Sequence, residues 1–226
     1  MKIIALLPMK GYSERVPNKN MRLFNGRPLY HCVADVLEAC QFVSSFVINT
    51  DSQVISEDAA KHYSKVRIIK RPQELCGDFV PMNEIIQYDM AASDGEHFVQ
   101  THSTNPLLTP ETLGRAAEEY FNALATFDSL FSVTRLQTRL YWASGDPVNH
   151  NPGELIRTQD LPPVFEENSN IYLFSKTSFK SAGNKRIGLK PKMFEISKME
   201  AIDIDEEEDF KLAETLFRMR KPGVQS

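Results

Sequence analysis

Two clusters of ionisable residues have the types and spacing needed to hold a phosphorylated ligand, and the first lies near the N-terminus. Lys10, Arg15 and Lys19 lie in a short segment that also contains Gly11 and Ser13. Such a segment suits an oligophosphate, because ammonium, guanidinium and backbone N–H groups can share its anionic oxygens. It is neither a Walker A loop nor a GxGxxG dinucleotide turn. A solvated basic loop is the alternative interpretation, since short charge runs are common.

The second cluster is a pair of carboxylates, Asp203 and Asp205, within Ala201-Ile-Asp-Ile-Asp205. On an extended segment, residues two apart point to the same side. Two such carboxylates suit Mg²⁺, which takes few protein carboxylates and completes its shell with water and phosphate oxygens. Asp205 also precedes a run of glutamates, so it could instead cap a helix, with Glu208 closing a capping box. That structural role leaves Asp203 unexplained.

Other polar candidates follow predicted strands, where ligands bind in open α/β sheets. Arg71, whose rigid guanidinium suits a base carbonyl or a phosphate, lies in Arg71-Pro-Gln-Glu-Leu-Cys-Gly-Asp78. His102 and Asn105 follow a later strand and could contact a sugar, and Arg157 could pair with a substrate carboxylate. The structural alternatives are a surface ion pair for Arg71, a position at the rim of the site for Arg157 and a hydrogen-bonded structural role for His102.

Alternating strand and helix patterns position these candidates. The apolar run that ends at Pro8 has the length of a parallel strand buried on both faces. Further strands are expected near residues 46–48, 66–69, 97–100, 171–174 and 193–196. Five helices are expected. One spans Pro28 to Cys40, one ends at about His62, one contains Ile85, Ile86 and Met90, one spans Thr109 to Leu124, and the last contains Phe210 to Phe217. This regular alternation predicts a mostly parallel α/β sheet.

The chain of 226 residues has the length of one domain spanning residues 1–226. The pattern loosens between about residues 137 and 170, which indicates an irregular excursion from the sheet. This excursion could form a substrate wall, a lid or a subunit contact. Tyr141, Trp142 and Leu155 suit a subunit contact, and a flap folded back on its own domain is the alternative.

Composition excludes several classes of protein. The formal net charge of -4 gives no overall attraction for nucleic acid or an anionic membrane surface. The 3 cysteines form no CxxC pair, so they are expected to be reduced. No apolar stretch approaches the roughly 20 residues of a membrane helix, and the N-terminus does not resemble a signal peptide. We therefore expect a cytoplasmic protein.

Several motifs in order along the chain resemble those of one enzyme family. They are Leu6-Leu-Pro-Met-Lys-Gly-Tyr-Ser-Glu-Arg-Val-Pro-Asn-Lys-Asn20, Asn25-Gly-Arg-Pro-Leu29, Asn49-Thr-Asp-Ser52, Arg71-Pro-Gln-Glu-Leu75, Ser103-Thr-Asn-Pro-Leu107 and Ile202-Asp-Ile-Asp205. Together they resemble the acylneuraminate cytidylyltransferase family, which makes CMP-activated sialic acids and related nonulosonates. The resemblance implies a three-layer, Rossmann-like nucleotidyltransferase sheet.

The resemblance also implies roles for individual residues at the nucleotide. Lys10, Arg15 and Lys19 would stabilise the phosphates of CTP, with Lys19 beside the α-phosphate. Asn20 would hold the nucleotide and Arg71 would read the cytosine. The remaining residues implied to line the nucleotide site are Gly11, Ser13, Asp78 and Met82. Asp203 and Asp205 would bind the catalytic Mg²⁺.

On the sugar side, the resemblance implies contacts from His102, Asn105, Arg157 and Glu166. Arg157 would face the carboxylate of the sugar, and the irregular segment would form a homodimer contact. The chain departs from the family pattern here, because His102 replaces a usual glutamine and Glu166 replaces an arginine found in many relatives. Met82 likewise stands where the family often has a small hydroxyl residue. The identity of the sugar acid therefore stays open.

The implied reaction transfers CMP from CTP to the anomeric hydroxyl of a sialic-acid-like 2-keto-3-deoxy sugar acid and releases pyrophosphate. His102 or a metal-bound hydroxide could remove the hydroxyl proton. One alternative is activation of Kdo, because Ser13-x-Arg15-x-Pro17-x-Lys19 also resembles those enzymes. Alternatives of other classes are a metal-dependent glycosyltransferase, which also uses an Asp-x-Asp pair, and a binding module without turnover.

Overall fold

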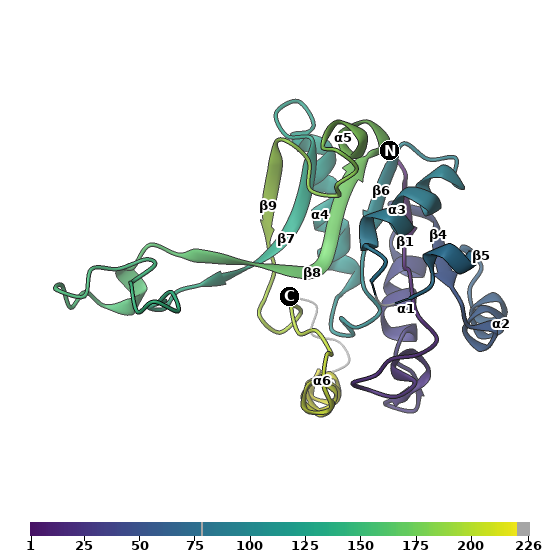
Figure 1. The fold of residues 1–226 in the computed structure, drawn as a ribbon, viewed down its shortest axis with the longest axis horizontal. Helices are drawn as coiled ribbons and strands as arrows, with labels where there is room; N and C mark the ends of the chain where they lie inside the picture. The colour runs from purple at the N-terminus through teal and green to yellow at the C-terminus, as the bar shows by residue number, and fades with distance from the viewer. Residues whose placement is uncertain (78, 221–226) are drawn as a thin grey trace.

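The computed structural model describes residues 1–77 and 79–220, and its centre is a sheet of seven strands (Figure 1). The strand order is β5-β4-β1-β6-β8-β7-β9. Their bounds are β1 Ile3–Leu6, β4 Val43–Thr50, β5 Val66–Lys70, β6 His97–Gln100, β7 Ser129–Leu136, β8 Val164–Ser175 and β9 Pro191–Glu195. Only β8 runs antiparallel to its neighbours, β6 and β7. The predicted mostly parallel sheet is confirmed.

Helices cover both faces of the sheet and produce three layers. One face packs against α1 (His31–Ala39), α2 (Gln53–His62) and α4 (Pro110–Ala123), and the other against α3 (Met82–Ala91) and α5 (Lys176–Ser181). The last helix, α6 (Glu207–Met219), packs on the hairpin of β2 (Leu23–Phe24) and β3 (Arg27–Pro28). No helix within residues 1–77 and 79–220 has both the length and the apolar character that crossing a membrane requires.

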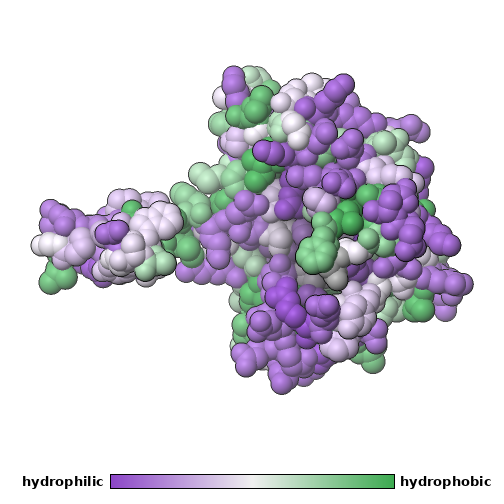
Figure 2. Space-filling model, viewed as in Figure 1, coloured by the Kyte–Doolittle hydropathy of each residue, from purple (hydrophilic) through white to green (hydrophobic). Residues whose placement is uncertain are grey.

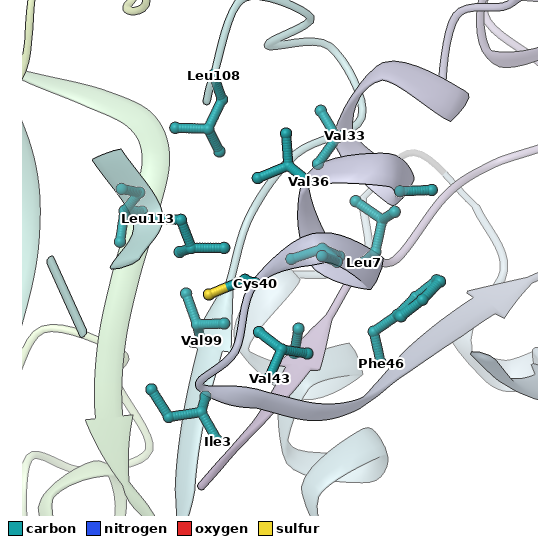
Figure 3. Close-up of a cluster of buried hydrophobic side chains, with 14 of the residues drawn as sticks. Ile3, Leu7, Val33, Val36, Cys40, Val43, Phe46, Val99, Leu108 and Leu113 are labelled. Carbon is teal, nitrogen blue, oxygen red and sulfur yellow. The ribbon is translucent and has the colours of Figure 1, made fainter. Parts of the chain in front are cut away.

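The first strand is buried on both faces, as its apolar run predicts. Ile3, Ala5 and Leu7 point into the larger core beneath α1, and Leu6 points into the core on the opposite face. Figure 3 shows Ile3 and Leu7 among side chains from α1, β4 and β6. A rigid strand of this kind fixes where the loop after Pro8 begins, which positions the cationic segment.

Some predicted boundaries are wrong. Pro28 belongs to β3, and α1 begins three residues later at His31. The strand β7 and the short helix α5 were not predicted. Buried polar residues explain the missed strand, since Ser129, Ser132 and Thr134 interrupt its apolar alternation. Ser132 is satisfied by Asn168, to which its Oγ donates, so the polar residue is tolerated inside the sheet.

The irregular excursion is a projecting arm rather than a flap folded on its own domain (Figure 1). Its base is the paired stretch of β7 and β8 from Val133↔Glu167 to Leu136↔Val164, so the predicted irregular range of 137–170 ends too late. Residues 137–163 form the tip, which includes the short 3₁₀ turn Thr158–Asp160. Figure 2 shows the arm standing clear of the body, and Tyr141, Trp142 and Leu155 on it are exposed.

Candidate active site

The cationic segment forms a loop at the carboxyl end of β1 that is closed by its own hydrogen bonds. The Asn20 side chain donates from Nδ2 to the carbonyl of Lys10 at 2.9 Å, and Ser103 Oγ donates to Asn20 Oδ1 at 2.7 Å. Lys19 begins the 3₁₀ turn Lys19–Met21. Asn20 thus joins both ends of the loop to the segment after β6, which gives it a positioning role in this chain.

Gly11 allows this loop to lie against the end of β4. Its backbone N–H donates to Asp51 Oδ1 at 2.7 Å. A Cβ atom at this position would lie 2.8 Å from Ser52 Cβ, a distance shorter than real contacts permit. Glycine is therefore required here by close approach, and the loop is fixed from two sides.

A cavity of 410 Å³ opens beside this loop. Its walls include Lys10, Ser13, Arg15, Lys19, Asn20 and His102, together with Pro8, Met9, Tyr12, Glu14, Ser103 and Thr104. Six of the residues predicted from sequence thus line one space. The concentration of cations and hydroxyl groups in it suits a polyanion.

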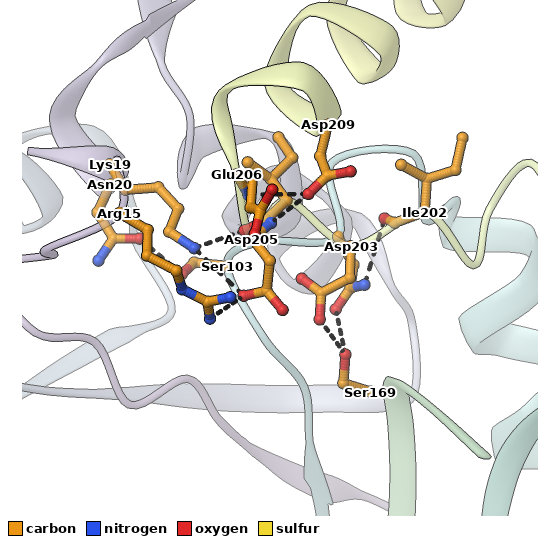
Figure 4. Close-up of polar contacts among 12 residues, drawn as sticks. Arg15, Lys19, Asn20, Ser103, Ser169, Ile202, Asp203, Asp205, Glu206 and Asp209 are labelled. Atoms are coloured by element: carbon orange, nitrogen blue, oxygen red, sulfur yellow. Dashed lines mark hydrogen bonds and ion pairs between the residues drawn. The ribbon is translucent and has the colours of Figure 1, made fainter. Parts of the chain in front are cut away.

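The aspartate segment 202–205 lies against the cationic loop (Figure 4). Lys19 donates from Nζ to the carbonyl of Ile204 at 2.5 Å and lies 3.8 Å from Asp205 Oδ1. Arg15 donates from Nη2 to Asp205 Oδ1 at 2.8 Å. Residues nearly two hundred positions apart in sequence therefore meet at one edge of the sheet.

The pKa of Lys19 is lowered from its ordinary value because burial disfavours the charged ammonium. The negative charges of Asp205 and Asp203 oppose that effect. The side chain is only 11% exposed. A lysine held in this way presents a poorly hydrated ammonium to a ligand, which strengthens its interaction with a phosphate oxygen.

The two aspartates have different partners. Asp203 Oδ2 accepts a hydrogen bond from Ser169 Oγ at 2.7 Å, and Figure 4 shows both carboxylates on the side of the segment away from α6. Asp205 does not cap α6 with Glu208. Glu206 is the N-cap residue, and Asp209 completes the capping box by accepting from the Glu206 N–H at 2.8 Å. Both aspartates are therefore released from a capping role.

The donor set fits a divalent cation. Asp203 Oδ1 is buried and has no hydrogen-bond partner among the residues that the structure describes. A buried carboxylate oxygen without a partner is costly, and a bound cation would remove that cost. Another group of ionisable residues, His31, Asp58 and His62, also lies close enough to hold a metal. It offers imidazole nitrogens, which suit Mg²⁺ poorly, and Asp58 already bonds Tyr30 and His31.

His102 lies at the far wall of the same cavity. Its Nε2 is buried without a partner in the described part of the chain. Burial lowers the pKa of His102 to about 4, with the positive charges of Arg186 and Lys19 acting in the same direction and Asp203 opposing them. His102 is therefore neutral at physiological pH and offers a hydrogen bond to a ligand rather than a charge.

The substitution His102→Gln is expected to reduce the loss of stability in mild acid. The pKa of His102 is about 4 in the folded protein but near 6.5 without burial, so between these values the unfolded chain binds more protons. Stability therefore falls as the pH falls through this window. Urea denaturation at about pH 7.5 and about pH 5 should show a smaller drop for the variant than for wild type. Equal drops would contradict this assignment.

Arg71 is buried and held by backbone and amide groups. It donates from Nε to Asn49 Oδ1 at 2.8 Å and from Nη2 to the carbonyls of Asn49 and Met9 at 2.8 and 3.2 Å. Asn49 in turn donates to Asp89, and burial raises the pKa of Asp89 to about 7. This network joins the ends of β1, β4 and β5, so Arg71 has a clear structural role here. A contact with cytosine stays a prediction.

Another predicted nucleotide residue, Met82, lies apart from this cavity. Met82 is the first residue of α3 and packs beside the core formed by Leu6 and Phe98. It does not line the cavity of the cationic loop. Asp78 lies outside the described residues. Their predicted roles at the base therefore stay predictions.

A second cavity, of 270 Å³, adjoins the aspartate segment on the side of β8. It is lined by Glu166, Glu167, Asn168, Ser169, Tyr172, Ala201 and Asp203. Asn105 is fully buried behind it, where its Nδ2 donates to the Ile202 carbonyl at 3.3 Å and its Oδ1 accepts from Ser169 at 3.4 Å. Asn105 thus holds the backbone next to Asp203 and the serine that bonds its carboxylate, while Glu166 lies on the cavity wall.

Arg157 does not reach either cavity within this chain. It lies on the arm with a side chain that is 73% exposed, and its guanidinium pairs with Asp160 at 2.7 and 3.2 Å. Arg157 is therefore a surface arginine in an ion pair on the arm. Any contact of Arg157 with a sugar stays a prediction.

Sequence reasoning missed Ser169 and Tyr172. Ser169 was assigned to the irregular excursion, so its place beside Asp203 on a strand was not visible. Tyr172 was expected only as a core residue of a strand, although its hydroxyl donates to Glu167 Oε1 at 2.6 Å at the edge of the second cavity. An earlier start for β8 would have pointed to both residues.

Comparison with protein families decides the classification. The family model described as "Cytidylyltransferase" matches residues 4–222. The chain belongs to the cytidylyltransferase family. This membership confirms the predicted nucleotidyltransferase, and relatives within the family confirm the resemblance to the enzymes that activate acylneuraminates.

Three relatives illustrate where this cytidylyltransferase lies in the family. A CMP-N,N'-diacetyllegionaminic acid synthase from Legionella pneumophila is 26% identical over 99% of this chain and 100% of its own length. Post-translational flagellin modification protein B from Campylobacter coli is 25% identical over 96% of this chain and 95% of its own length. N-acylneuraminate cytidylyltransferase A from Danio rerio is 28% identical over 94% of this chain and 50% of its own length.

Solved structures agree on the fold of this cytidylyltransferase. The structure of CMP:2-keto-3-deoxy-manno-octonic acid synthetase complexed with CTP superimposes with a TM-score of 0.72 at 10% identity, covering 96% of this chain and 99% of the other. A 4-diphosphocytidyl-2C-methyl-D-erythritol synthase from Anaerococcus prevotii gives 0.66 at 13% identity, with 96% of each chain covered. At these identities the likeness establishes the predicted three-layer fold.

Proposed function

We propose that this cytidylyltransferase transfers CMP from CTP to the anomeric hydroxyl of a sialic-acid-like 2-keto-3-deoxy sugar acid and releases pyrophosphate. The observation that carries the proposal is the meeting of Lys19 and Arg15 with Asp205 at the rim of the 410 Å³ cavity. Cations for a triphosphate and carboxylates for its metal lie together there. The names of full-length relatives such as the legionaminic acid synthase support the choice of acceptor.

The cationic loop supplies the electrostatic part of the reaction. The anomeric oxygen attacks the α-phosphorus, a new P–O bond forms, and the bond to the bridging oxygen breaks as pyrophosphate leaves. Lys10, Arg15 and Lys19 neutralise the charge that accumulates on the phosphates. The hydroxyl proton passes to water. The pKa of His102, about 4, makes it a weak base, so its role is to hold a ligand group by a hydrogen bond.

Mg²⁺ is the cofactor that we propose for the aspartate segment. Asp203 and Asp205 would hold it, with the unpartnered Asp203 Oδ1 available as a ligand atom. When bound, the ion would withdraw electron density from the phosphate and screen its charge. Ser169 and Asn105 orient Asp203 for this purpose, because they bond its carboxylate and its neighbouring backbone.

The arm supports a homodimer. Tyr141, Trp142 and Leu155 are 55%, 64% and 94% exposed on a projection with no body beneath it. Apolar side chains in such a position would be buried by a second copy of the chain. Sedimentation of the purified protein as a monomer at micromolar concentration would contradict this part of the proposal.

A chain that consumes CTP would work in the cytoplasm.

Pyrophosphate release with a panel of acceptors tests the proposed function. The reactions would contain CTP, Mg²⁺ and, separately, sialic, legionaminic, pseudaminic and Kdo-type acids. Release with a nonulosonate supports the proposal, and release with Kdo alone would favour the alternative acceptor. A glycosyltransferase would consume a nucleotide sugar without releasing pyrophosphate. CTP binding without product from any acid would indicate a binding module.

A further inference from the structure

One arginine beside the acceptor end of the site has no anionic partner. Arg186 lies between α5 and β9, and its side chain is half-buried. Its guanidinium carbon lies 3.8 Å from the ring centroid of Tyr172, and its Nη1 donates to Gln100 Oε1 at 2.5 Å. The stacked ring and the buried amide hold the guanidinium in one orientation.

Several other arginines of the chain have carboxylate partners, whereas Arg71 and Arg220, which also lack one among the described residues, donate to backbone carbonyls. Carboxylates pair with Arg15, Arg22, Arg27, Arg157 and Arg218. Within residues 1–77 and 79–220, no carboxylate lies within ion-pair distance of Arg186, and only its Nη1 donates a hydrogen bond. The pKa of Arg186 is lowered because burial disfavours its charge. Nε and Nη2 thus remain as two parallel donors for a ligand.

The surroundings place Arg186 at the acceptor rather than at the triphosphate. It does not line the cavity that holds Lys10, Arg15 and Lys19. Its stacking partner Tyr172 lines the second cavity together with Asp203. Its charge also lowers the pKa of His102, which lines the first cavity. Arg186 therefore neighbours residues of both cavities and lies outside the one formed by the cationic loop.

The second cavity needs a cation if a sugar acid is to enter it. Three acidic residues line it, Glu166, Glu167 and Asp203, and within the described part of the chain no cation does. Glutamates of this kind can accept hydrogen bonds from sugar hydroxyls, but they repel a carboxylate. The half-buried guanidinium of Arg186, stacked on the ring of Tyr172, is a positive charge close enough to offset that repulsion.

We propose that Arg186 binds the carboxylate of the sugar acid through Nε and Nη2, and so selects acidic acceptors. The assignment rests on the proposed function, since it names the residue that recognises the acceptor of that reaction. It explains how this chain can bind an acid in a cavity lined by glutamates. It also gives Gln100 and Tyr172 a role, because both fix the plane of the guanidinium.

The test compares Arg186→Gln with wild type on two acceptors, the sugar acid that the enzyme uses and its neutral carboxamide. The variant should raise the KM for the acid about 100-fold and leave the KM for CTP within about twofold. Wild type should prefer the acid over the amide by a similar factor, and the variant should lose that preference. An unchanged KM for the acid, or an equal loss on both acceptors, would overturn the assignment.

Controls separate this assignment from a structural role and from failure of the proposed function. Arg115→Gln removes another arginine that lies over an aromatic ring, 5.7 Å from the centroid of Phe194, and should leave both KM values unchanged. If Arg186→Gln does not fold, Arg186→Lys serves instead. It keeps the charge but not the fork, so the KM for the acid should rise about tenfold, and an unchanged value would overturn the assignment. Wild-type enzyme that releases no pyrophosphate with any acid would overturn the proposed function itself.

Discussion

Replacing Lys19 with alanine is expected to lower kcat for pyrophosphate release about 1,000-fold, because it removes a preorganised charge at the reacting phosphate. Lys19 is only 11% exposed, and its Nζ is held by the carbonyl of Ile204 beside Asp205. This ammonium therefore needs little rearrangement when negative charge develops on the phosphate. Steady-state kinetics with coupled pyrophosphate detection would measure the loss.

Lys65→Ala is the matched control for that variant. Lys65 also donates from Nζ to a backbone carbonyl, that of Glu38 at 2.6 Å, and it lines neither of the two cavities of the site. It should retain full turnover. If Lys19→Ala kept more than about a tenth of wild-type kcat while remaining folded, Lys19 would not be the charge that stabilises the reacting phosphate.

Replacing Asp203 with asparagine is expected to lower kcat about 1,000-fold and to abolish binding of a divalent cation in the presence of CTP. Asparagine keeps the size of the side chain and its contact with Ser169, but it removes the negative charge. Binding of Mn²⁺, followed by its effect on water proton relaxation, measures the metal without requiring turnover. Metal binding equal to that of wild type would contradict the role of Asp203.

A surface aspartate controls for the loss of charge in that experiment. Asp94 is exposed at the end of the turn before β6, so Asp94→Asn should change neither turnover nor Mn²⁺ binding. Treatment of wild-type enzyme with a chelator should reproduce the loss of activity in Asp203→Asn, and added Mg²⁺ should restore activity only in wild type.

The sequence predicts this site well where local chemistry is concentrated. The loop with Lys10, Arg15 and Lys19 can be identified directly, because it is a turn-rich cationic segment that follows a buried strand, where ligands bind in open α/β sheets. The meeting of this loop with Asp205 cannot be derived from spacing. It depends on α6 packing against the β2–β3 hairpin through Phe24 and Phe210, which brings the segment before α6 beside the cationic loop.

Recognition of the acceptor was harder to predict. Ser169 lies on β8, and the part of β8 that pairs with β7 at the base of the arm contains polar residues. The sequence of this segment therefore lacks the apolar pattern of a strand. Arg186 follows a Gly-Asn-Lys sequence that indicates only a turn. Only the structure shows that the guanidinium of Arg186 stacks on Tyr172 and has no carboxylate partner among the described residues. Arg157 shows the opposite case, since a residue chosen for its chemistry lies on the arm and pairs with Asp160.

The most direct test of the central claim is identification of the product. Purified enzyme would be incubated with CTP, Mg²⁺ and legionaminic, pseudaminic or sialic acid, and the products would be followed by ³¹P NMR and mass spectrometry. We expect one CMP-linked sugar acid, with a phosphodiester signal, for each pyrophosphate released, and no product from Asp203→Asn. Pyrophosphate without a CMP-linked sugar, or consumption of CTP with none of these acids, would contradict the claim.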